Sequence, residues 1–341
     1  MTERELIESA REGDEDAFGR LVDPHRGGLL AHCYRMLGSP QDAEDALQET
    51  LLRAWRGLQG FEGRSSPRSW LYTIATNASL RAIERRPPRV MPLDYGPASD
   101  PHEAPAGRLS EPVWVEPLAD ERLAPADAGS LTPEARYEQL ESIELAFVAA
   151  LQTLPARQRA VLVLREVLGF SARETGVALS ISAPAVDSAL QRARKTIEAH
   201  LPERSQQATL RALGDKRVAE IVNGYMAAWE QGDAAALAEL LADDATISMP
   251  PQPSWYSGRA AVEQFVASHP MAAGRRWPCV QVAANGQLAF AHYAVDPVDG
   301  SIAGPHDICV VELAGERIAS ITAFLMPHLF PHFGLGERLQ T

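Results

Sequence analysis

Hydrophobic side chains recur every three or four residues through the first 88 positions of the chain. The pattern runs through Ala17, Phe18, Leu21, Val22, Leu29, Leu30, Cys33, Met36 and Leu37. This period predicts helices that each bury one face. Pro24, Gly38 and the glycine-containing stretch 60–63 predict breaks between them. We therefore expect residues 1–88 to form a small all-helical domain.

The next part of the chain changes composition. Residues 89–132 are rich in Pro, Ala, Gly and acids and keep no sustained period, which is typical of a flexible linker. Its one apolar island, VWVEPL at 113–118, is a candidate for docking on another part of the chain. Helical spacing returns over 133–151 and continues to about residue 201, so a second all-helical domain is expected over 133–203.

The last third of the chain combines both periods. Helical patterns at 218–230 and 234–242 precede runs of alternating polarity at 245–249, 288–295, 308–313 and 318–325. We expect an α+β domain over residues 210–336. The predicted fold class is thus multidomain, with two all-α domains followed by an α+β domain.

Charge separates the same regions. The net charge of −13 argues against a nucleic-acid partner. However, residues 53–89 contain eight Arg against two Glu, and residues 157–195 contain seven basic residues against three acids. Residues 91–132, between them, contain eight acids against two Arg. The chain therefore has two basic modules joined by an acidic connector, which its total charge conceals.

The stretch SPQDAEDALQET (39–50) predicts a well-defined helix start. Ser39 can accept a hydrogen bond from the backbone N–H of Asp42, Pro40 suits the first turn, and acids suit the positive helix end. These local effects explain where the helix begins. They do not explain why its surface combines acids with leucines.

Residues 170–197 predict a helix-turn-helix. Ser171 and Glu174 can form a capping box, LSIS provides the turn, and Ser182 can cap the second helix, which has Pro184 in its first turn. Gly176 supplies the small residue that a close helix crossing needs. The second helix carries short side chains first and basic ones later, an order that suits base edges and then phosphates. The alternative is a helical hairpin with a solvated basic face.

Residues 61–89 contain a Gly/Ser/Pro loop followed by a helix with aromatic and basic side chains. Trp70 and Tyr72 lie near Asn77, Arg81 and Arg85, a combination suited to extruded bases, each of which contributes about 1–3 kcal/mol by stacking. The alternative is that the aromatic and aliphatic residues of this helix are core.

Cysteine usage and hydropathy exclude several classes of protein. Cys33, Cys279 and Cys309 are too far apart for a C-x-x-C metal pair or a disulfide framework and are expected to be buried apolar side chains. No apolar run approaches the roughly 20 residues that span a bilayer, and the first residues are polar. We expect a cytoplasmic protein with no membrane association, no metal and no cofactor.

Taken in order, three blocks of sequence resemble the extracytoplasmic-function (ECF) group of bacterial sigma-70 factors, which direct RNA polymerase to promoters. The block from DAFGRLVDPHRGG to LQGF and the block SPRSWLYTIATNASLRAIERR resemble the two halves of sigma domain 2. The block from LQTLPARQR to QRARKTI resembles sigma domain 4. Together they cover about 190 residues in the correct order. The resemblance implies a transcription initiation factor without enzymatic activity.

The resemblance also implies a role for each block. The DAEDALQET helix would dock on the clamp helices of the largest subunit of the RNA polymerase core, through Asp42, Glu44, Asp45, Leu47, Gln48, Glu49, Leu51 and Leu52. The −10 element of promoter DNA would be captured by Phe61, Ser66, Trp70, Asn77, Arg81 and Arg85. The −35 element would be read by Ser182, Ala183, Ala185, Val186, Ser188, Ala189, Gln191, Arg192, Arg194 and Lys195.

Two departures from the family pattern limit what can be predicted about DNA sequence. Family members often have Ile-Ala where Thr175-Gly176 stands, and Asn or Lys where Asp187 stands. Asp187 does not suit phosphate, although it can accept from a cytosine amino group. By the resemblance, the acidic linker would pass the polymerase active-site cleft, and an anti-sigma protein is a candidate partner.

The C-terminal region resembles SnoaL-like domains, which share the cone-shaped α+β fold of nuclear transport factor two and ketosteroid isomerase. The resemblance rests on the block from YMAAWEQGD to AAVEQF and on ITAFLMPHLFPHFGL. Such domains often contain a pocket, for which Trp255, Tyr256, His292 and Asp307 are candidates. Alternating strands can bring His292 and Asp307 inward together. The domain could modulate polymerase binding in cis, sense a small ligand, or catalyse a reaction.

Two other functions remain open from sequence alone. A helix-turn-helix regulator with a sensory domain would bind duplex DNA by itself but would not need the DAEDALQET helix. An isomerase with a helical appendage would have a polar pocket holding a carboxylate of raised pKa. Promoter sequences, the inducing signal, any ligand and the oligomeric state do not follow from the sequence.

Overall fold

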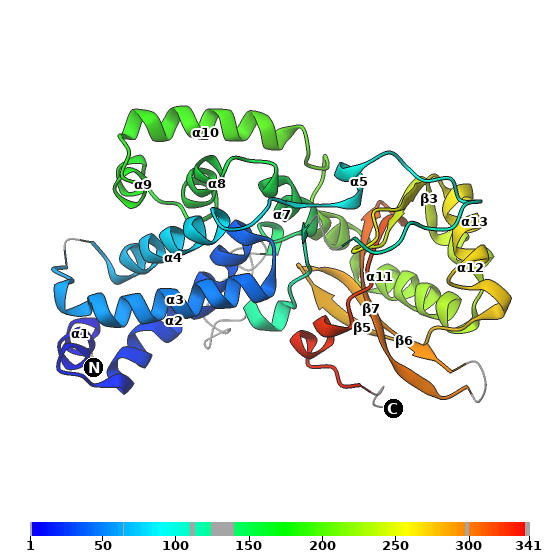
Figure 1. The fold of residues 1–341 in the computed structure, drawn as a ribbon, viewed down its shortest axis with the longest axis horizontal. Coiled ribbons are helices and arrows are strands. Elements are labelled where there is room, and N and C mark those ends of the chain that lie inside the picture. Colours follow the sequence, from blue (N-terminus) through cyan, green and yellow to red (C-terminus); the bar gives the residue numbers. More distant parts are fainter. Residues whose placement is uncertain (1, 64, 110–112, 124–139, 297–299, 338–341) are drawn as a thin grey trace. The chain divides into compact units, whose positions relative to one another are not determined.

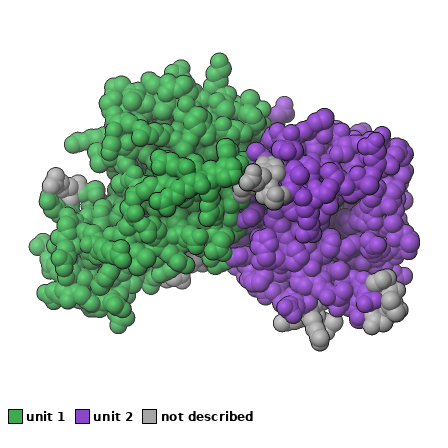
Figure 2. Space-filling model, viewed as in Figure 1, with its two compact units in different colours: residues 1–89, 122–201 green, residues 90–121, 202–341 purple. Residues whose placement is uncertain are grey.

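The computed structural model describes residues 2–63, 65–109, 113–123, 140–296 and 300–337 (Figure 1). The chain forms two compact units, coloured separately in Figure 2. Unit 1 combines Met1–Arg89 with Arg122–Leu201, and unit 2 combines Val90–Glu121 with Pro202–Thr341. The two predicted helical domains therefore share one unit, and most of the predicted linker belongs with the C-terminal region.

Unit 1 is entirely helical over its described core. Its first half consists of α1 (Glu3–Arg11), α2 (Glu15–Leu37), α3 (Pro40–Gly57), the short η1 (Leu58–Gly60) and α4 (Pro67–Ile83). Its second half consists of α7 (Leu145–Gln152), α8 (Ala156–Leu162), the π-helical turn η3 (Val163–Val167), α9 (Ala172–Leu179) and α10 (Ala183–Glu198). Helices α2, α3 and α4 pack against one another, and α10 packs on α8 and α9.

The predicted helix starts are confirmed. The side chain of Ser39 accepts from the backbone N–H of Asp42, and Ser182 accepts from that of Ala185. Ser171 and Glu174 form the reciprocal capping box. Each cap satisfies a backbone donor that a helix leaves without a partner in its first turn.

Two predicted helix boundaries in unit 1 are wrong. Pro24 lies inside α2, because loss of one backbone hydrogen bond is offset by buried side chains in the turns on both sides of it. Part of the helix expected over 133–151 lies outside the described residues. In the described part, the chain leaves the helix at residues 142–144, where Ser142 accepts from Arg35, and α7 begins at Leu145.

Unit 2 is an α+β domain, as predicted. Its strands are β3 (Leu241–Ser248), β4 (Trp255–Ser257), β5 (Cys279–Ala284), β6 (Gln287–Val295), β7 (Ile302–Ala314) and β8 (Arg317–Phe324). They form one sheet in the order β4-β3-β8-β7-β6-β5, in which only β3 and β8 pair in parallel. The sequence pattern did not predict β4 or β5, because β4 is very short and neither strand alternates strongly.

The helices of unit 2 cover the sheet and close its core. They are α11 (Gln206–Gln231), α12 (Ala234–Leu240), α13 (Arg259–Ser268) and the short η4 (Ala272–Gly274) and η5 (Pro327–Phe333). Helix α11 packs on β5 and β7, and α13 packs on β3 and β4. Their apolar faces and the inner face of the sheet form one cluster of buried residues that includes Tyr225, Trp229, Phe265 and Phe290.

The segment predicted to be a flexible linker is held in place by unit 2. It contains β1 (Arg89–Val90), α5 (Pro92–Tyr95), β2 (Val113–Trp114) and η2 (Asp120–Leu123). Trp114 and Leu118 are buried, and the backbone N–H of Leu118 donates to Asn285 Oδ1 at 2.9 Å, while Asn285 N–H donates to the Leu118 carbonyl at 2.9 Å. The apolar island thus docks on the β5–β6 turn, and the expectation of a flexible linker does not hold for these residues.

Candidate functional site

The outer face of α3 combines an exposed leucine with polar side chains. Leu52 is 51% exposed and is one of four large apolar side chains that remain exposed among the described residues. Asp45 and Gln48 are exposed beside it in the helix sequence, whereas Leu47 is buried and Leu51 and Glu49 are partly buried. Apolar area rimmed by polar groups is typical of a protein–protein interface.

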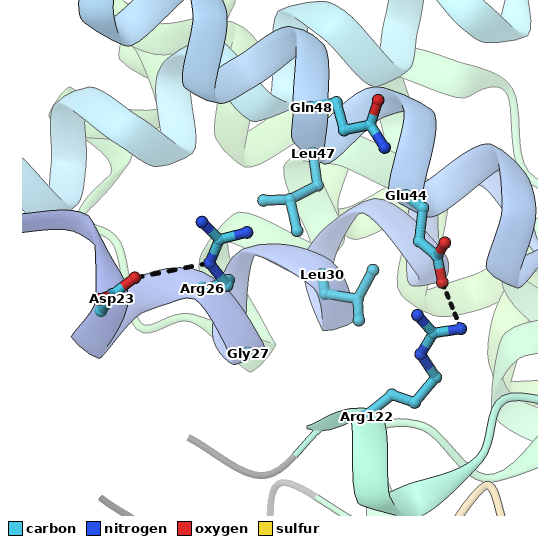
Figure 3. Close-up of a pocket in the computed structure, with 8 residues that line it drawn as sticks. All are labelled: Asp23, Arg26, Gly27, Leu30, Glu44, Leu47, Gln48 and Arg122. Carbon is cyan, nitrogen blue, oxygen red and sulfur yellow. Dashed lines mark ion pairs between the residues drawn. The ribbon is translucent and has the colours of Figure 1, made fainter. Parts of the chain in front are cut away.

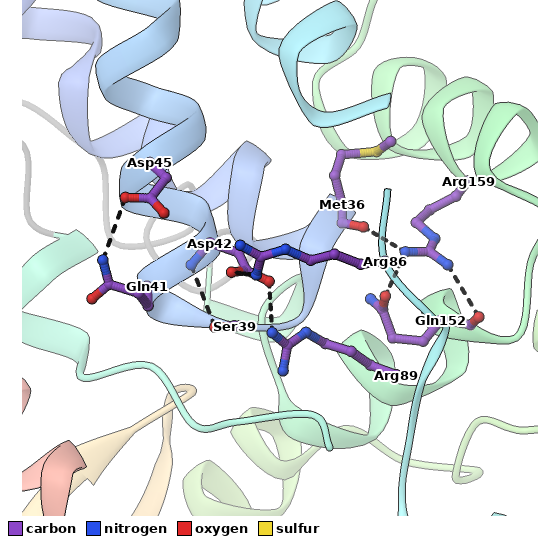
Figure 4. A network of polar contacts seen from close by, with 9 residues as sticks. All are labelled: Met36, Ser39, Gln41, Asp42, Asp45, Arg86, Arg89, Gln152 and Arg159. Carbon is purple, nitrogen blue, oxygen red and sulfur yellow. Dashed lines mark hydrogen bonds and ion pairs between the residues drawn. The ribbon is translucent and has the colours of Figure 1, made fainter. Parts of the chain in front are cut away.

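Asp42 does not belong to this exposed face. It is 5% exposed and accepts ion pairs from Arg86 and from Arg89, the latter at 2.6 Å (Figure 4). Removing one partner of a buried pair leaves an uncompensated charge, so Asp42 holds the chain after α4 against the start of α3. The expectation that Asp42 meets a basic residue of the polymerase is therefore contradicted by its burial.

A second buried network joins the two halves of unit 1. The guanidinium of Arg159 donates to the carbonyl of Met36 and to the side-chain and backbone oxygens of Gln152 (Figure 4). Gln152 in turn donates to the carbonyl of Arg35 at 3.2 Å. Burial lowers the pKa of Arg159 to about 10, so it stays charged at neutral pH. The end of α2 is thus tied to the α7–α8 turn.

A pocket of about 450 Å³ lies between α2 and α3 (Figure 3). It is lined by Asp23, Arg26, Gly27, Leu30, Glu44, Leu47, Gln48 and Arg122. Arg122, from the end of the linker, forms an ion pair with Glu44 at 2.5 Å across one side of the pocket. Three of the predicted polymerase-binding residues, Glu44, Leu47 and Gln48, therefore line a pocket that Arg122 partly covers.

The aromatic residues before α4 pack inward rather than outward. Phe61 is 7% exposed and lies against Trp70, with ring centroids 4.8 Å apart, in a cluster with α1 and α2. This burial contradicts the expectation that Phe61 meets DNA and supports the alternative that these rings are core; Trp70 remains partly exposed. Ser66 is exposed and caps α4 by accepting from the backbone N–H of Ser69.

The polar face of α4 is partly occupied by the second half of unit 1. The Asn77 amide donates to the carbonyl of Ala178 in α9 at 3.4 Å and to that of Thr73 at 2.9 Å. Arg68 donates to the carbonyl of Leu168 at 3.0 Å, and its guanidinium lies 5.1 Å from the ring of Phe170 and 5.2 Å from that of Tyr72. Cation–π contacts of this kind contribute about 0.5–1 kcal/mol at exposed sites.

The basic end of α4 is more open. Arg81 and Arg85 are exposed, and Arg81 donates only to the backbone carbonyl of Asn77. Arg85 has no side-chain hydrogen bond or ion pair with any described residue. The predicted −10 residues are thus divided between core (Phe61), an internal contact (Asn77) and open surface (Arg81, Arg85).

The helix-turn-helix has the geometry that Gly176 predicts. A Cβ added at Gly176 would lie 2.7 Å from the carbonyl oxygen of Ile181, closer than real Cβ atoms come to backbone. The absence of a side chain lets α9 approach the turn before α10. This close approach fixes how far α10 projects from the rest of unit 1.

Helix α10 buries one face and exposes the other. Val186 and Ala189, predicted to contact DNA, are buried against α8 and α9 and therefore do not belong to the outer face. The outer face carries Ser182, Ala185, Asp187, Ser188, Gln191, Arg192, Arg194 and Lys195. Arg194 forms an ion pair with Glu166 at 2.6 Å. The side chains of Gln191, Arg192 and Lys195 make no hydrogen bond or ion pair with the described residues.

In unit 2, the strands bring His292 and Asp307 together as predicted. The two residues are register partners on β6 and β7, and His292 Nδ1 lies 2.9 Å from Asp307 Oδ1, both buried. Burial opposes ionisation of Asp307, but the neighbouring His292 and His306 outweigh it and hold the pKa of Asp307 well below its usual range. This carboxylate is thus the opposite of the raised-pKa acid expected in an isomerase of this fold.

The two aromatic candidates of the pocket have other partners. The indole N–H of Trp255 donates to the carbonyl of Gly96 at 2.8 Å, and the Trp255 carbonyl accepts from Ser99 N–H. Trp255 therefore holds the linker segment. Tyr256 is fully buried and stacks on Phe265, with centroids 4.1 Å apart.

Comparison with known proteins connects these surfaces to a family. Family models match residues 21–87 as sigma-70 region 2, residues 144–197 as sigma-70 region 4 and residues 222–321 as a SnoaL-like domain. The chain is 41% identical over 334 residues to the ECF RNA polymerase sigma factor SigG of Mycobacterium tuberculosis, covering 96% of this chain and 86% of SigG. The chain belongs to the ECF sigma factors.

Two further relatives match different shares of this sigma factor. The ECF RNA polymerase sigma factor SigW of Bacillus subtilis is 30% identical over 201 residues, covering 59% of this chain and 97% of SigW. The crystal structure of SigJ, an ECF sigma factor of Mycobacterium tuberculosis, shares the fold with a TM-score of 0.60 at 20% identity, covering 92% of this chain and 98% of that one. SigG and SigW are both ECF RNA polymerase sigma factors.

The matched regions contain the surfaces described above. Region 2 of this sigma factor covers α3 and α4 completely, and region 4 covers α7 to α10 except for the last residue of α10. Sequence analysis missed Arg68, Phe170 and Arg122, since their importance comes from partners far away in the chain. Among the described residues, no helix is both long and apolar enough to cross a membrane.

Proposed function

We propose that this sigma factor docks on the RNA polymerase core through the exposed face of α3 and the pocket beside it. The observation that carries this proposal is Leu52, a large apolar side chain left 51% exposed among acids and amides. Interfaces place such an apolar residue at their centre and polar groups at the rim. Glu44, Asp45 and Glu49 would then meet basic residues of the clamp helices of the largest subunit.

Promoter recognition is divided between two helices. In this proposal α10 enters the major groove at the −35 element with Ser182, Ala185, Ser188 and Gln191 near base edges. Arg192 and Lys195 contact phosphates, which fixes the position of the helix but carries no sequence information. Helix α4 reads the −10 element through Asn77, Arg81 and Arg85, beside the exposed Ser66.

The contacts of α4 and α3 favour a self-covered free form. Asn77 is already bonded to Ala178, and Arg68 is held between Leu168, Tyr72 and Phe170. Arg122 already forms an ion pair with Glu44, as a basic residue of the clamp helices would in this proposal. In this proposal, α3 must release Arg122 to bind the polymerase core, and α4 must release its contacts with the second half of unit 1 to bind DNA. Core binding and exposure of α4 are therefore coupled.

Unit 2 provides a route for control in cis. The chain between Arg89 and Arg122 connects the region 2 and region 4 parts of unit 1, yet it packs and bonds within unit 2 through Trp114, Leu118 and Asn285. If the chain between Arg89 and Arg122 stays docked in unit 2, less of it is free to let the region 2 and region 4 parts move apart. In this proposal the SnoaL-like domain restrains opening by holding the linker.

The proposal is tested by runoff transcription with the full-length chain, purified bacterial core polymerase and genomic promoter fragments. Wild type should give promoter-specific transcripts, and Leu52→Asp should lose them together with core binding, while its circular dichroism stays unchanged. Gln59→Asp, an exposed residue just beyond α3, is the matched control and should behave as wild type. Normal core binding by Leu52→Asp would contradict the docking assignment.

The control by the linker is tested with Asn285→Gly. Asn285 has a positive φ of 57°, which Gly adopts without strain. The change therefore removes the side-chain oxygen that accepts from Leu118 N–H and keeps the backbone bond from residue 285 to the Leu118 carbonyl. We expect more transcript per mole of core at subsaturating sigma factor. Equal or lower activity with an intact fold would show that the docked linker does not restrain the protein.

A further inference from the structure

The interior of unit 2 contains a buried group of side chains that neither polymerase binding nor DNA recognition uses. His292, Asp307 and Cys309 each offer one ligand atom, and these atoms lie within 4.8 Å of one another. All three residues are at most 5% exposed. The group forms only in the fold, because the three residues come from two strands and lack any metal-binding spacing in the sequence.

Strand register explains why they meet. His292 and Asp307 are direct partners on β6 and β7, and Cys309 follows Asp307 by two residues, so all three side chains lie on one face of the sheet. Cys279 on β5 is the register partner of His292 on the other side and is also buried. Directly opposed residues have Cβ atoms about 4.5–5.5 Å apart. A second thiol therefore lies on the neighbouring strand, although its sulfur is outside the group whose ligand atoms lie within 4.8 Å of one another and would have to move toward it to bind an ion.

The distances suit a small cation. Asp307 Oδ1 lies 2.9 Å from His292 Nδ1 and 3.0 Å from Cys309 Sγ. Metal bonds of about 2.0–2.3 Å to N, O and S in a tetrahedron place the ligand atoms roughly 3.3–3.7 Å apart. The two distances to Asp307 Oδ1 need to lengthen by only about half an ångström to admit an ion.

The surroundings supply what a metal centre also needs. His306 Nδ1 lies 2.7 Å from the second carboxylate oxygen of Asp307, which would orient that carboxylate from outside the ligand set. An ion shared with Asp307 would be bound by His292 Nδ1, which faces that carboxylate, and the ring proton would then lie on Nε2, which is buried and has no hydrogen-bond partner among the described residues. Thiolate, imidazole and carboxylate together favour a borderline-soft divalent ion.

We propose that the SnoaL-like domain binds one thiophilic divalent cation, with Zn²⁺ as the probe, through His292, Asp307 and Cys309 and with Cys279 as the fourth ligand. Binding replaces the Cys309 S–H proton: Cys309–SH + Zn²⁺ gives Cys309–S–Zn⁺ + H⁺, and Cys279 releases its proton in the same way. No electron is transferred. The proposal is independent of the proposed function, since it concerns the interior of unit 2 alone.

The test uses the full-length chain, treated with chelator, passed through gel filtration and titrated with Zn²⁺ against a chromophoric chelator. We expect one Zn²⁺ per chain. Cys309→Ser keeps a hydroxyl donor for Asp307 and should bind at least 10- to 100-fold more weakly. Cys33→Ser, a buried thiol in unit 1, is the matched control and should bind as wild type. His306→Ala, at a partly exposed position, should weaken binding by about 10-fold while the fold is kept.

Two spectroscopic and thermal readouts separate a metal site from a hydrogen-bonded core. Co²⁺ should give thiolate-to-metal charge-transfer absorption in wild type that Cys309→Ser lacks, and Zn²⁺ should raise the melting temperature of wild type but not of Cys309→Ser. Absence of retained metal in wild type, or equal binding by folded Cys309→Ser, would overturn the proposal. Runoff transcription by the metal-free chain tests the sigma function separately, so failure of one does not hide failure of the other.

Discussion

The two helices of unit 1 that we propose to contact promoter DNA, α4 and α10, are presented differently. Helix α10 exposes Gln191, Arg192 and Lys195, which make no bond to the described part of the chain. In helix α4, by contrast, Asn77 and Arg68 donate hydrogen bonds to backbone carbonyls in the second half of the unit. If the proposed roles hold, α10 can contact the −35 element before polymerase is bound, whereas α4 must first lose internal contacts to reach the −10 element.

The largest expected effect sharpens the α10 side of the comparison. Arg192→Ala with Lys195→Ala should weaken binding of duplex −35 DNA on the order of 10- to 100-fold and lower the salt dependence by about two phosphate contacts. Stability should not change, because both side chains are exposed. Fluorescence anisotropy across a salt series measures both quantities. An unchanged salt slope would remove α10 from the DNA interface.

The next effect concerns how α10 is positioned. Gly176→Ala places a Cβ against the Ile181 carbonyl and should destabilise the helix-turn-helix by about 1–3 kcal/mol. Gly57→Ala is the matched control, since the added Cβ would lie 3.6 Å from the nearest atom, on the Trp70 ring, which is an ordinary van der Waals distance. Urea unfolding of both variants gives the comparison. Equal stability of the two would mean that the close crossing is not required.

A smaller effect comes from the buried side of α4. His32 Nε2 lies 2.9 Å from Thr76 Oγ1, and burial, with a lesser contribution from Arg35, lowers the pKa of His32 to about 3. In the unfolded chain its pKa is about 6.5. The unfolded state therefore binds more protons between these values, and stability is lost as pH falls from 6.5 toward 3.

This pH dependence can be isolated with His32→Gln, which keeps a donor for Thr76 but does not titrate. Between pH 6.5 and 5.5 the free energy of unfolding of wild type should fall by about 1 kcal/mol more than that of the variant. Urea denaturation at the two pH values provides the numbers. Parallel curves for both proteins would show that His32 is not held neutral in the fold.

The smallest expected effect concerns the contact that Arg68 and Tyr72 of α4 make with Phe170 in the second half of unit 1. Phe170→Leu removes the ring that Arg68 and Tyr72 contact but keeps an apolar side chain, so the contact should weaken by about 1 kcal/mol. Binding of single-stranded −10 DNA by the free chain should rise by a few fold. Unaltered or weaker binding by a folded variant would indicate that this contact does not restrain α4.

Much of unit 1 could be predicted because its signals are local. The caps at Ser39, Ser171 and Ser182 and the close crossing at Gly176 depend on residues within a few positions of each other. The errors concern distant partners. Asp42 is buried by Arg86 and Arg89, and Phe61 by Trp70, and no helical period reveals such pairs. Val186 and Ala189, predicted to contact DNA, share the buried face of α10 with Leu190 and Ala193, each four residues further along the helix.

Unit 2 shows the same limit. Alternation correctly predicted the strand that carries His292, but the strand predicted over 308–313 begins one residue after Asp307, whereas β7 begins at Ile302. Register brings His292 and Asp307 together. The docking of Leu118 on Asn285 could not be predicted, since the two residues are far apart in sequence and the linker has no period of its own. Strand β4 was missed because three residues are too few to establish alternation.

The most direct test of the central claim uses single cysteines, since Cys33, Cys279 and Cys309 are all buried. Asn77→Cys on α4 and Gln191→Cys on α10 are compared by their rates of maleimide modification in the free chain and after addition of polymerase core. The account predicts fast modification at 191 in both states, and slow modification at 77 that accelerates when core binds. Equal rates at the two positions in the free chain would contradict it.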